Sequence, residues 1–174
     1  MKISGRTIKQ RLYGLRKLPS DLKRARYFRG HGVHSPYVYS IVRQVFMVSH
    51  LVSDEHSLYE ALLSRGVGRK RATQLQNLAC HCHYERVGID CAVEEFSEYD
   101  MVIATVDIPL EQLPAMAHEA HQQQMTLCVM SPSLNRERDK MCKSLVEEHP
   151  STSVDNRGYL LLFNNHLPKQ IFKL

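Results

Sequence analysis

The sequence of 174 residues contains no long hydrophobic run. No apolar stretch approaches the roughly 18 residues that a membrane-spanning helix needs, so we expect no transmembrane segment. The basic N-terminal end also lacks the apolar core of a secretory signal. There is no internal repeat and no low-complexity segment. Together with a length that suffices for one hydrophobic core, these absences predict a single globular domain.

A disulfide framework is not expected, because the number of cysteines is small and odd. Cys128 in addition lies inside an apolar run, where a thiol packs as a small hydrophobic group. Reduced thiols indicate a cytoplasmic protein. The five cysteines are Cys80, Cys82, Cys91, Cys128 and Cys142.

The pattern of a metal site is missing as well. The run Cys80-His81-Cys82-His83 contains zinc-binding residue types, but neighbours at a helix end point in different directions. Zinc sites use two pairs of ligands, each spaced by roughly two to four residues. His118 and His121 offer a second pair, yet nothing in the sequence brings them to the first. We therefore predict no metal site, and we find no Ser-His-Asp or Cys-His relay.

The net charge of +5 conceals a division of the chain. Residues 1–34 carry ten Lys and Arg against the single Asp21, a net of +9, whereas residues 35–174 carry 13 against 17, a net of −4. We expect a basic helical arm and hinge over 1–34 and one domain over 35–174. Through residues 2–29, such an arm suits nucleic acid, an acidic membrane surface or an acidic protein, and the sequence does not choose among them. The candidate polyanion-binding residues are Arg6, Lys9, Arg11, Arg16, Lys17, Lys23, Arg24, Arg26 and Arg29.

Helical spacing marks both the arm and its junction with the domain. Ile8, Leu12 and Leu15 recur at helical intervals among basic residues, which predicts a short amphipathic helix. After the glycines of the hinge, Ser35 suits an N-cap and the proline that follows it suits the first helical position. We expect a helix over 36–46. His31 and His34 flank this start, and we expect them to fix the hinge through hydrogen bonds to nearby backbone.

Two more helices should follow before the pattern changes. Ser53 is placed to cap a helix that ends at Gly66. The next helix begins near Gly68 and presents apolar residues on one face as far as Cys82.

From residue 86 onward, short apolar strands alternate with helices. This alternation predicts an α/β fold, a Rossmann-like parallel sheet with a C-terminal antiparallel hairpin, preceded by N-terminal helices. The hairpin turns at Asn156-Arg157-Gly158, where we expect Gly158 in the left-handed position. The predicted strands are 86–90, 100–106, 125–130, 151–155, 159–163 and an edge strand at 171–174, with helices over about 114–123 and 135–148.

The segment His31-Gly32-Val33-His34-Ser35-Pro36, followed by Tyr37, Val38 and Tyr39, resembles the HGVHSPFVF-type segment of methyltransferase-like proteins from Bacteroidetes. The C-terminal end, 167–174, is similar to the KQHFKL-like finish of that group. The resemblance covers the two ends of the chain. It implies a class I S-adenosylmethionine-dependent methyltransferase fold, with strand order 3-2-1-4-5-7-6 and an added N-terminal helix.

The chain departs from this family where the cofactor binds. The family's glycine-rich turn after the first strand is absent, and Gly66-Val67-Gly68 follows a helix instead. We favour loss of strands two and three, which leaves a reduced sheet of order 1-4-5-7-6. The remaining candidate cofactor-binding residues, implied by the resemblance, lie at the ends of the first two strands. They are Gly88, Asp90, Thr105 and Asp107.

The metal ligands of the family's O-methyltransferases are not carried over. Where those enzymes place an acid at the end of strand four, this chain has Thr105, with Asp107 two residues on. Where they place an acid and an amide after strand five, it has Met130-Ser131. Catalytic residues therefore stay unassigned.

The sequence leaves three functions open. The first is a methyltransferase-like, non-catalytic domain for binding or scaffolding, with no cofactor expected. The second is an active methyltransferase that uses S-adenosylmethionine through an atypical loop. It requires a pocket at the carboxyl ends of strands 86–90 and 100–106, and it fails if side chains such as Tyr84 or Phe96 plug those ends. The third is an RNA- or membrane-surface-binding module that acts through the basic arm.

Overall fold

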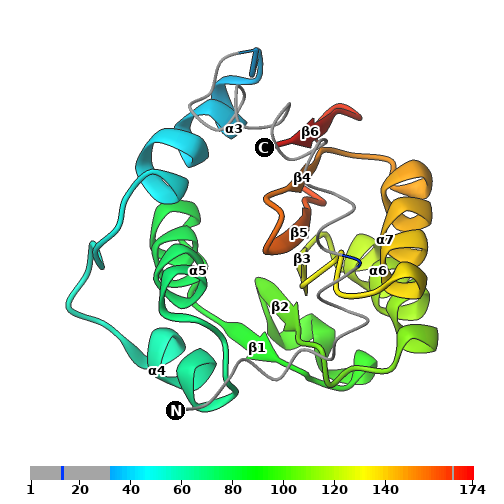
Figure 1. Ribbon diagram of the computed structural model, residues 1–174, viewed down its shortest axis with the longest axis horizontal. Coiled ribbons are helices and arrows are strands. Elements are labelled where there is room, and N and C mark those ends of the chain that lie inside the picture. Colours follow the sequence, from blue (N-terminus) through cyan, green and yellow to red (C-terminus); the bar gives the residue numbers. More distant parts are fainter. Residues whose placement is uncertain (1–12, 14–31, 166) are drawn as a thin grey trace.

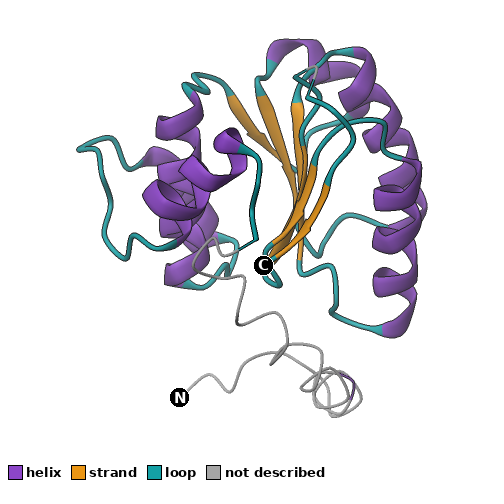
Figure 2. Cartoon of the chain, turned by 90° about the horizontal axis from the view of Figure 1, so that it is seen from above, coloured by secondary structure: helices purple, strands orange, loops and turns teal. Residues whose placement is uncertain are grey.

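The computed structural model describes residue 13, residues 32–165 and residues 167–174. A six-stranded sheet lies between two layers of helices (Figures 1 and 2). In chain order the elements are α3 (Pro36–Ile41), the π-helix η1 (Val42–Phe46), α4 (Ser57–Ser64), α5 (Arg69–Cys82), β1 (Val87–Ile89), η2 (Val93–Glu98), β2 (Met101–Ala104), η3 (Leu110–Gln112), α6 (Leu113–Gln122), β3 (Thr126–Met130), α7 (Arg136–Glu148), β4 (Ser153–Asp155), β5 (Tyr159–Leu162) and β6 (Ile171–Lys173).

The sheet has the order β1-β2-β3-β5-β4-β6. β5 runs antiparallel to both of its neighbours, and all other pairs are parallel. This confirms the predicted parallel α/β sheet with an antiparallel hairpin near its C-terminal end, and it confirms β6 as the edge strand. The order of the first five strands is the order predicted for the reduced sheet.

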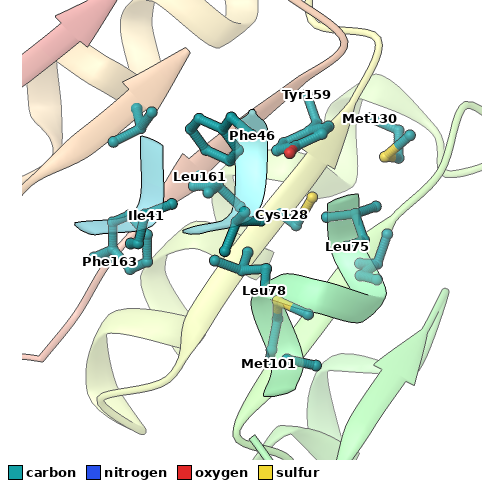
Figure 3. Close-up of a cluster of buried hydrophobic side chains, with 14 of the residues drawn as sticks. Ile41, Phe46, Leu75, Leu78, Met101, Cys128, Met130, Tyr159, Leu161 and Phe163 are labelled. Carbon is teal, nitrogen blue, oxygen red and sulfur yellow. The ribbon is translucent and has the colours of Figure 1, made fainter. Parts of the chain in front are cut away.

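Each face of the sheet packs against its own group of helices. α3, η1, α4 and α5 cover one face, and η2, α6 and α7 cover the other, as the view along the sheet shows (Figure 2). On the first face the aromatic rings of Phe46 and Tyr159 meet edge to face at 6.1 Å between centroids, beside Leu75, Leu78 and Leu161 (Figure 3). Strands buried on both faces account for the continuous apolar runs in the sequence.

The helix termini follow the sequence at one start and one end, and depart from it at another start. Ser35 caps α3 by accepting a hydrogen bond from the Val38 amide, as predicted. Gly66, with φ of 78°, ends α4. The predicted start of α4 at Ser53 is wrong, because the Ser53 hydroxyl accepts a hydrogen bond from the Glu55 amide in a local turn. The Glu55 carboxylate instead accepts from the amide of Ser57, where the helix begins.

The hairpin turn between β4 and β5 also differs from expectation. The left-handed residue is Arg157, with φ of 52°, and not Gly158. The Asp155 carboxylate accepts a hydrogen bond from the Arg157 amide and stabilises this conformation. The glycine serves a different purpose, because a Cβ at Gly158 would collide with the guanidinium of Arg71 on α5.

No helix in the described part of the chain is long and apolar enough to cross a membrane.

Candidate functional site

The carboxyl ends of the parallel strands β1, β2 and β3 emerge at one edge of the sheet, which we call the carboxyl edge. Asp90 follows β1 and adopts a left-handed conformation with φ of 56°. Its amide donates to the carbonyl of Ile103 at 3.0 Å, which holds the turn against β2. Thr105 follows β2 and is 3% exposed. Ligands of open α/β sheets bind outside this edge, so its side chains decide whether a cofactor site exists.

Asp90 and Thr105 are bonded to each other across the carboxyl edge. One carboxylate oxygen of Asp90 accepts from the Thr105 amide at 2.7 Å, and the other accepts from the Thr105 hydroxyl at 2.8 Å. The Thr105 hydroxyl oxygen in turn accepts from the amide of Asp107 at 3.2 Å. Three of the four candidate cofactor residues are thus brought together, and the bonds they make are to one another. Asp107 itself is exposed.

We call the hydrogen bonds between Asp90 and Thr105 the bridge. Arg138, which the sequence analysis did not single out, extends the bridge to β3. It lies in the first turn of α7 and is only 2% exposed. Its Nε donates to the carbonyl of Met130 at 3.1 Å and its Nη2 to the carbonyl of Thr105 at 2.9 Å. Burial lowers the pKa of the guanidinium, while the nearby Cys142 and Asp90 raise it. An arginine remains charged under such opposing influences.

The local sequence explains why Arg138 faces inward. Asn135 caps α7 by accepting from the Arg138 amide at 2.8 Å, which fixes where the helix begins. From that start, Arg138, Cys142 and Leu145 are spaced by four and three residues and are all buried. A charged residue on the apolar stripe of a helix is the signal that would have identified it from the sequence.

Gly88, the fourth candidate, lies in β1, two residues before Asp90. A Cβ built at this position would lie 2.5 Å from the Cys91 Sγ and 3.1 Å from a ring carbon of Tyr99. The space that the glycine leaves is therefore occupied by the chain's own loop. The hydrogen bond between Tyr99 and Cys91 raises the pKa of the tyrosine.

A second polar network lies further along the carboxyl edge, between α5 and the β4–β5 turn. The Arg71 guanidinium donates to Gln74 at 2.7 Å and to Asn156 at 3.4 Å, and it lies 5.6 Å from the ring centre of Tyr159. The Ser131 amide donates to the carbonyl of Gly158 at 2.8 Å. Burial lowers the pKa of Arg71.

The two side chains that would have ruled out a pocket by plugging the carboxyl ends lie elsewhere. The Tyr84 hydroxyl pairs with the hydroxyl of Thr126 at 2.7 Å, and Thr126 begins β3, so Tyr84 lies at the opposite edge of the sheet. Phe96 is fully buried in the core under α6. Neither Tyr84 nor Phe96 therefore plugs the carboxyl ends of β1 and β2.

The residues of Cys80-His81-Cys82-His83 are engaged separately, and their positions match the helix end that the sequence indicated. His81 pairs with the Ser40 hydroxyl at 3.1 Å, and the Cys82 Sγ lies 3.5 Å from the Tyr37 hydroxyl. Burial raises the pKa of the Cys82 thiol. Within the described residues no group of three or more His, Cys, Asp and Glu could hold a metal ion.

The nine candidate polyanion-binding residues, and His31 of the hinge, all lie outside the described residues. Tyr13 is the one described residue among the first 31. The turn Gly66-Val67-Gly68 joins α4 to α5 as a helix–helix connection.

No family model, no curated protein and no solved structure matches this chain.

Proposed function

We propose that the chain is a reduced, methyltransferase-like α/β domain that does not transfer methyl groups and that acts as a binding or scaffold domain. The strand order β1-β2-β3-β5-β4, with β5 antiparallel, supports the proposal. It is the order that remains when strands two and three are removed from the class I methyltransferase sheet, to which the ends of the sequence point.

The observation that carries the proposal is the bridge at the carboxyl edge. Both oxygens of the Asp90 carboxylate accept hydrogen bonds from Thr105, and buried Arg138 binds the carbonyls that end β2 and β3. A cofactor that approached Asp90 would have to compete with two short charge-assisted bonds. Each such bond contributes about 1.5–3 kcal/mol. The edge is thus stabilised by its own side chains, without a ligand.

The loop after β1 supports the same conclusion. In a cofactor site the missing side chain of a glycine lets a ligand approach the backbone. Beside Gly88 that space holds Cys91 and Tyr99. The backbone at Gly88 is therefore covered by protein atoms, and the half-buried Asp90 carboxylate is hydrogen-bonded to Thr105.

Methyl transfer from labelled S-adenosylmethionine tests the proposal. The full-length protein would be incubated with cofactor carrying a labelled methyl group and with the protein, nucleic-acid, lipid and small-molecule fractions of a cell extract. We expect no label incorporated above the level of a heat-denatured sample in any fraction. Protein-dependent incorporation that Asp90→Ala abolishes would overturn the proposal and restore the active enzyme.

The charge division favours a polyanion as the bound partner of such a domain. Residues 1–34 have a net charge of +9 against −4 for the remainder. We expect binding of the full chain to a homopolymeric RNA to weaken steeply with salt, since neutralised phosphates release counterions. A variant with the nine arm residues changed to glutamine should lose this binding. Equal binding by the variant would show that the arm is not the contact with RNA.

A further inference from the structure

A groove runs between α7 and the strands β4 and β6, on the face of the sheet that α7 covers. Its volume is about 350 Å³. Asp139 and Val146 of α7 form one wall, and Ser153 of β4 and Ile171 of β6 contribute to the other side. Ile171 is 48% exposed, which is high for a large apolar side chain. The Ser153 hydroxyl is buried and has no hydrogen-bond partner in the described part of the chain.

Tyr13, the described residue of the basic arm, contacts this groove. The Tyr13 hydroxyl donates to the Asp139 carboxylate at 2.7 Å, across 126 positions of sequence. Tyr13 is helical and half-buried. Burial raises the pKa of its phenol, and the hydrogen bond to Asp139 raises it further. Asp139 is 7% exposed and also pairs with Lys143 at 2.9 Å, so the phenol is bonded to a carboxylate that α7 already holds in place.

The charges around Tyr13 suit the same arrangement. In the helix that the sequence predicts for this part of the arm, Lys9, Arg16 and Lys17 are four, three and four residues from Tyr13 and share its face. The groove is lined by the carboxylates of Asp139, Glu147 and Asp155 together with the ammonium groups of Lys143 and Lys173, so its formal net charge is −1. A basic helix anchored by Tyr13 would therefore turn its cations toward the acidic domain.

We propose that the groove between α7 and β6 is the docking site of the basic arm of the same chain, anchored by the hydrogen bond from Tyr13 to Asp139. The occupant is the segment centred on Tyr13. Docking places the arm against the domain instead of leaving it as a free tail. The inference is independent of whether the carboxyl edge binds a cofactor.

Limited trypsin digestion of the full-length protein tests the docking, because the arm offers cleavage sites after Arg11, Arg16 and Lys17. Cleavage follows the population of the undocked state when docking is fast. We expect Tyr13→Phe, which removes only the phenolic oxygen, to raise the initial cleavage rate at these sites about tenfold. The rate at each site would be followed by mass spectrometry.

One control separates docking from a general loosening of the protein. Tyr39→Phe changes an exposed tyrosine on α3 that does not line the groove. It should leave arm cleavage within about twofold of wild type. Asp139→Asn should accelerate cleavage, and the double variant Tyr13→Phe with Asp139→Asn should be no faster than the faster single variant, because both changes remove the same bond.

Two results would overturn the inference. Cleavage of Tyr13→Phe at the wild-type rate would show that the phenol anchors nothing in solution. Protection of the wild-type arm that disappears on dilution would assign the groove to a second copy of the chain and not to the arm of its own chain.

Discussion

At the scale of single residues, the Asp90 carboxylate is the most informative group, because each of its two oxygens accepts a hydrogen bond from Thr105. Its left-handed backbone is a conformation that aspartate and asparagine tolerate and that alanine does not. Position 90 must therefore provide an acceptor for Thr105 and also adopt a left-handed backbone conformation. This gives the position a structural purpose apart from any ligand.

Substitutions at Asp90 should separate these requirements. We expect Asp90→Ala to lower the free energy of unfolding by about 2–4 kcal/mol. The substitution leaves the Thr105 amide and hydroxyl without their acceptor, and it strains the left-handed turn. Asp90→Asn keeps one acceptor and the tolerated backbone, so its loss should stay near 1 kcal/mol. Urea denaturation measures both. Equal losses in the two variants would show that the bridge does not stabilise the carboxyl edge.

The Ser153 hydroxyl predicts a change of the opposite sign. A buried hydroxyl without a partner costs about 1–3 kcal/mol, so Ser153→Ala should raise the free energy of unfolding by roughly 1 kcal/mol. Ser151 is the matched control, because its hydroxyl donates to the Leu167 carbonyl at 2.8 Å. Ser151→Ala should lower stability by a similar amount. A loss of stability in Ser153→Ala would mean that its hydroxyl is satisfied in solution.

At the scale of elements, the contact of β1 with the loop that follows it depends on Gly88. Gly88→Ala should lower the free energy of unfolding by about 1–3 kcal/mol, because its methyl group would meet the Cys91 Sγ at 2.5 Å. Removing that sulfur in Gly88→Ala with Cys91→Ala should restore part of the loss. Thermal unfolding followed by circular dichroism would report all of these changes.

Gly68 supplies the control for this experiment. A Cβ at Gly68 meets no atom within 4 Å, and the lost N-cap preference and the smaller unfolded-state entropy nearly cancel. Gly68→Ala should therefore change stability by less than about 0.5 kcal/mol. If Gly88→Ala proves equally harmless, the space beside β1 is open, and the argument from a covered glycine fails.

Much of the element order could be predicted from the sequence, because buried strands and amphipathic helices leave regular apolar patterns. The helix start at Ser35 follows from a local rule of capping, whereas the strand order was expected from the family resemblance. The start of α4 could not be predicted from the capping rule, since Ser53 bonds within its own turn and the amide of Ser57 is bonded by Glu55, which is not a preferred N-cap residue.

The candidate site was less predictable than the fold. Asp90 and Thr105 are recognisable from their positions after two apolar strands. Their mutual bond depends on the left-handed turn at Asp90, for which the sequence contains no glycine or asparagine signal. The need for Gly158 likewise depends on Arg71, 87 residues earlier in the chain, which no local pattern reveals.

At the scale of the whole molecule, buried His149 couples stability to pH. It is 6% exposed, follows α7 and donates from Nε2 to the Phe163 carbonyl at 2.9 Å. Burial lowers its pKa, the bond to Phe163 opposes this effect, and the nearby His121 and Lys169 lower it further. The folded protein therefore takes up this proton less readily than the unfolded chain does.

The direction of the pH effect follows from this difference. The stability that neutral His149 provides is complete above the ordinary histidine pKa of about 6.5 and is lost as the pH falls toward the lowered pKa of the folded state, by at most about 1.4 kcal/mol per pH unit. We expect His149→Gln to flatten the dependence between about pH 7.5 and 5.5, measured by urea denaturation. His81, whose pKa burial also lowers, should leave a residual slope. An unchanged slope in His149→Gln would contradict this assignment.

The central claim is the proposal that the carboxyl edge of this sheet is occupied by hydrogen bonds between the chain's own groups and binds no cofactor. Calorimetric titration of the full-length protein with S-adenosylmethionine and with S-adenosylhomocysteine tests it most directly. We predict no saturable heat up to about 1 mM of either compound, which corresponds to a binding free energy weaker than about −4 kcal/mol. A micromolar Kd that Asp90→Ala abolishes would contradict the claim and would assign the carboxyl edge to a working cofactor site.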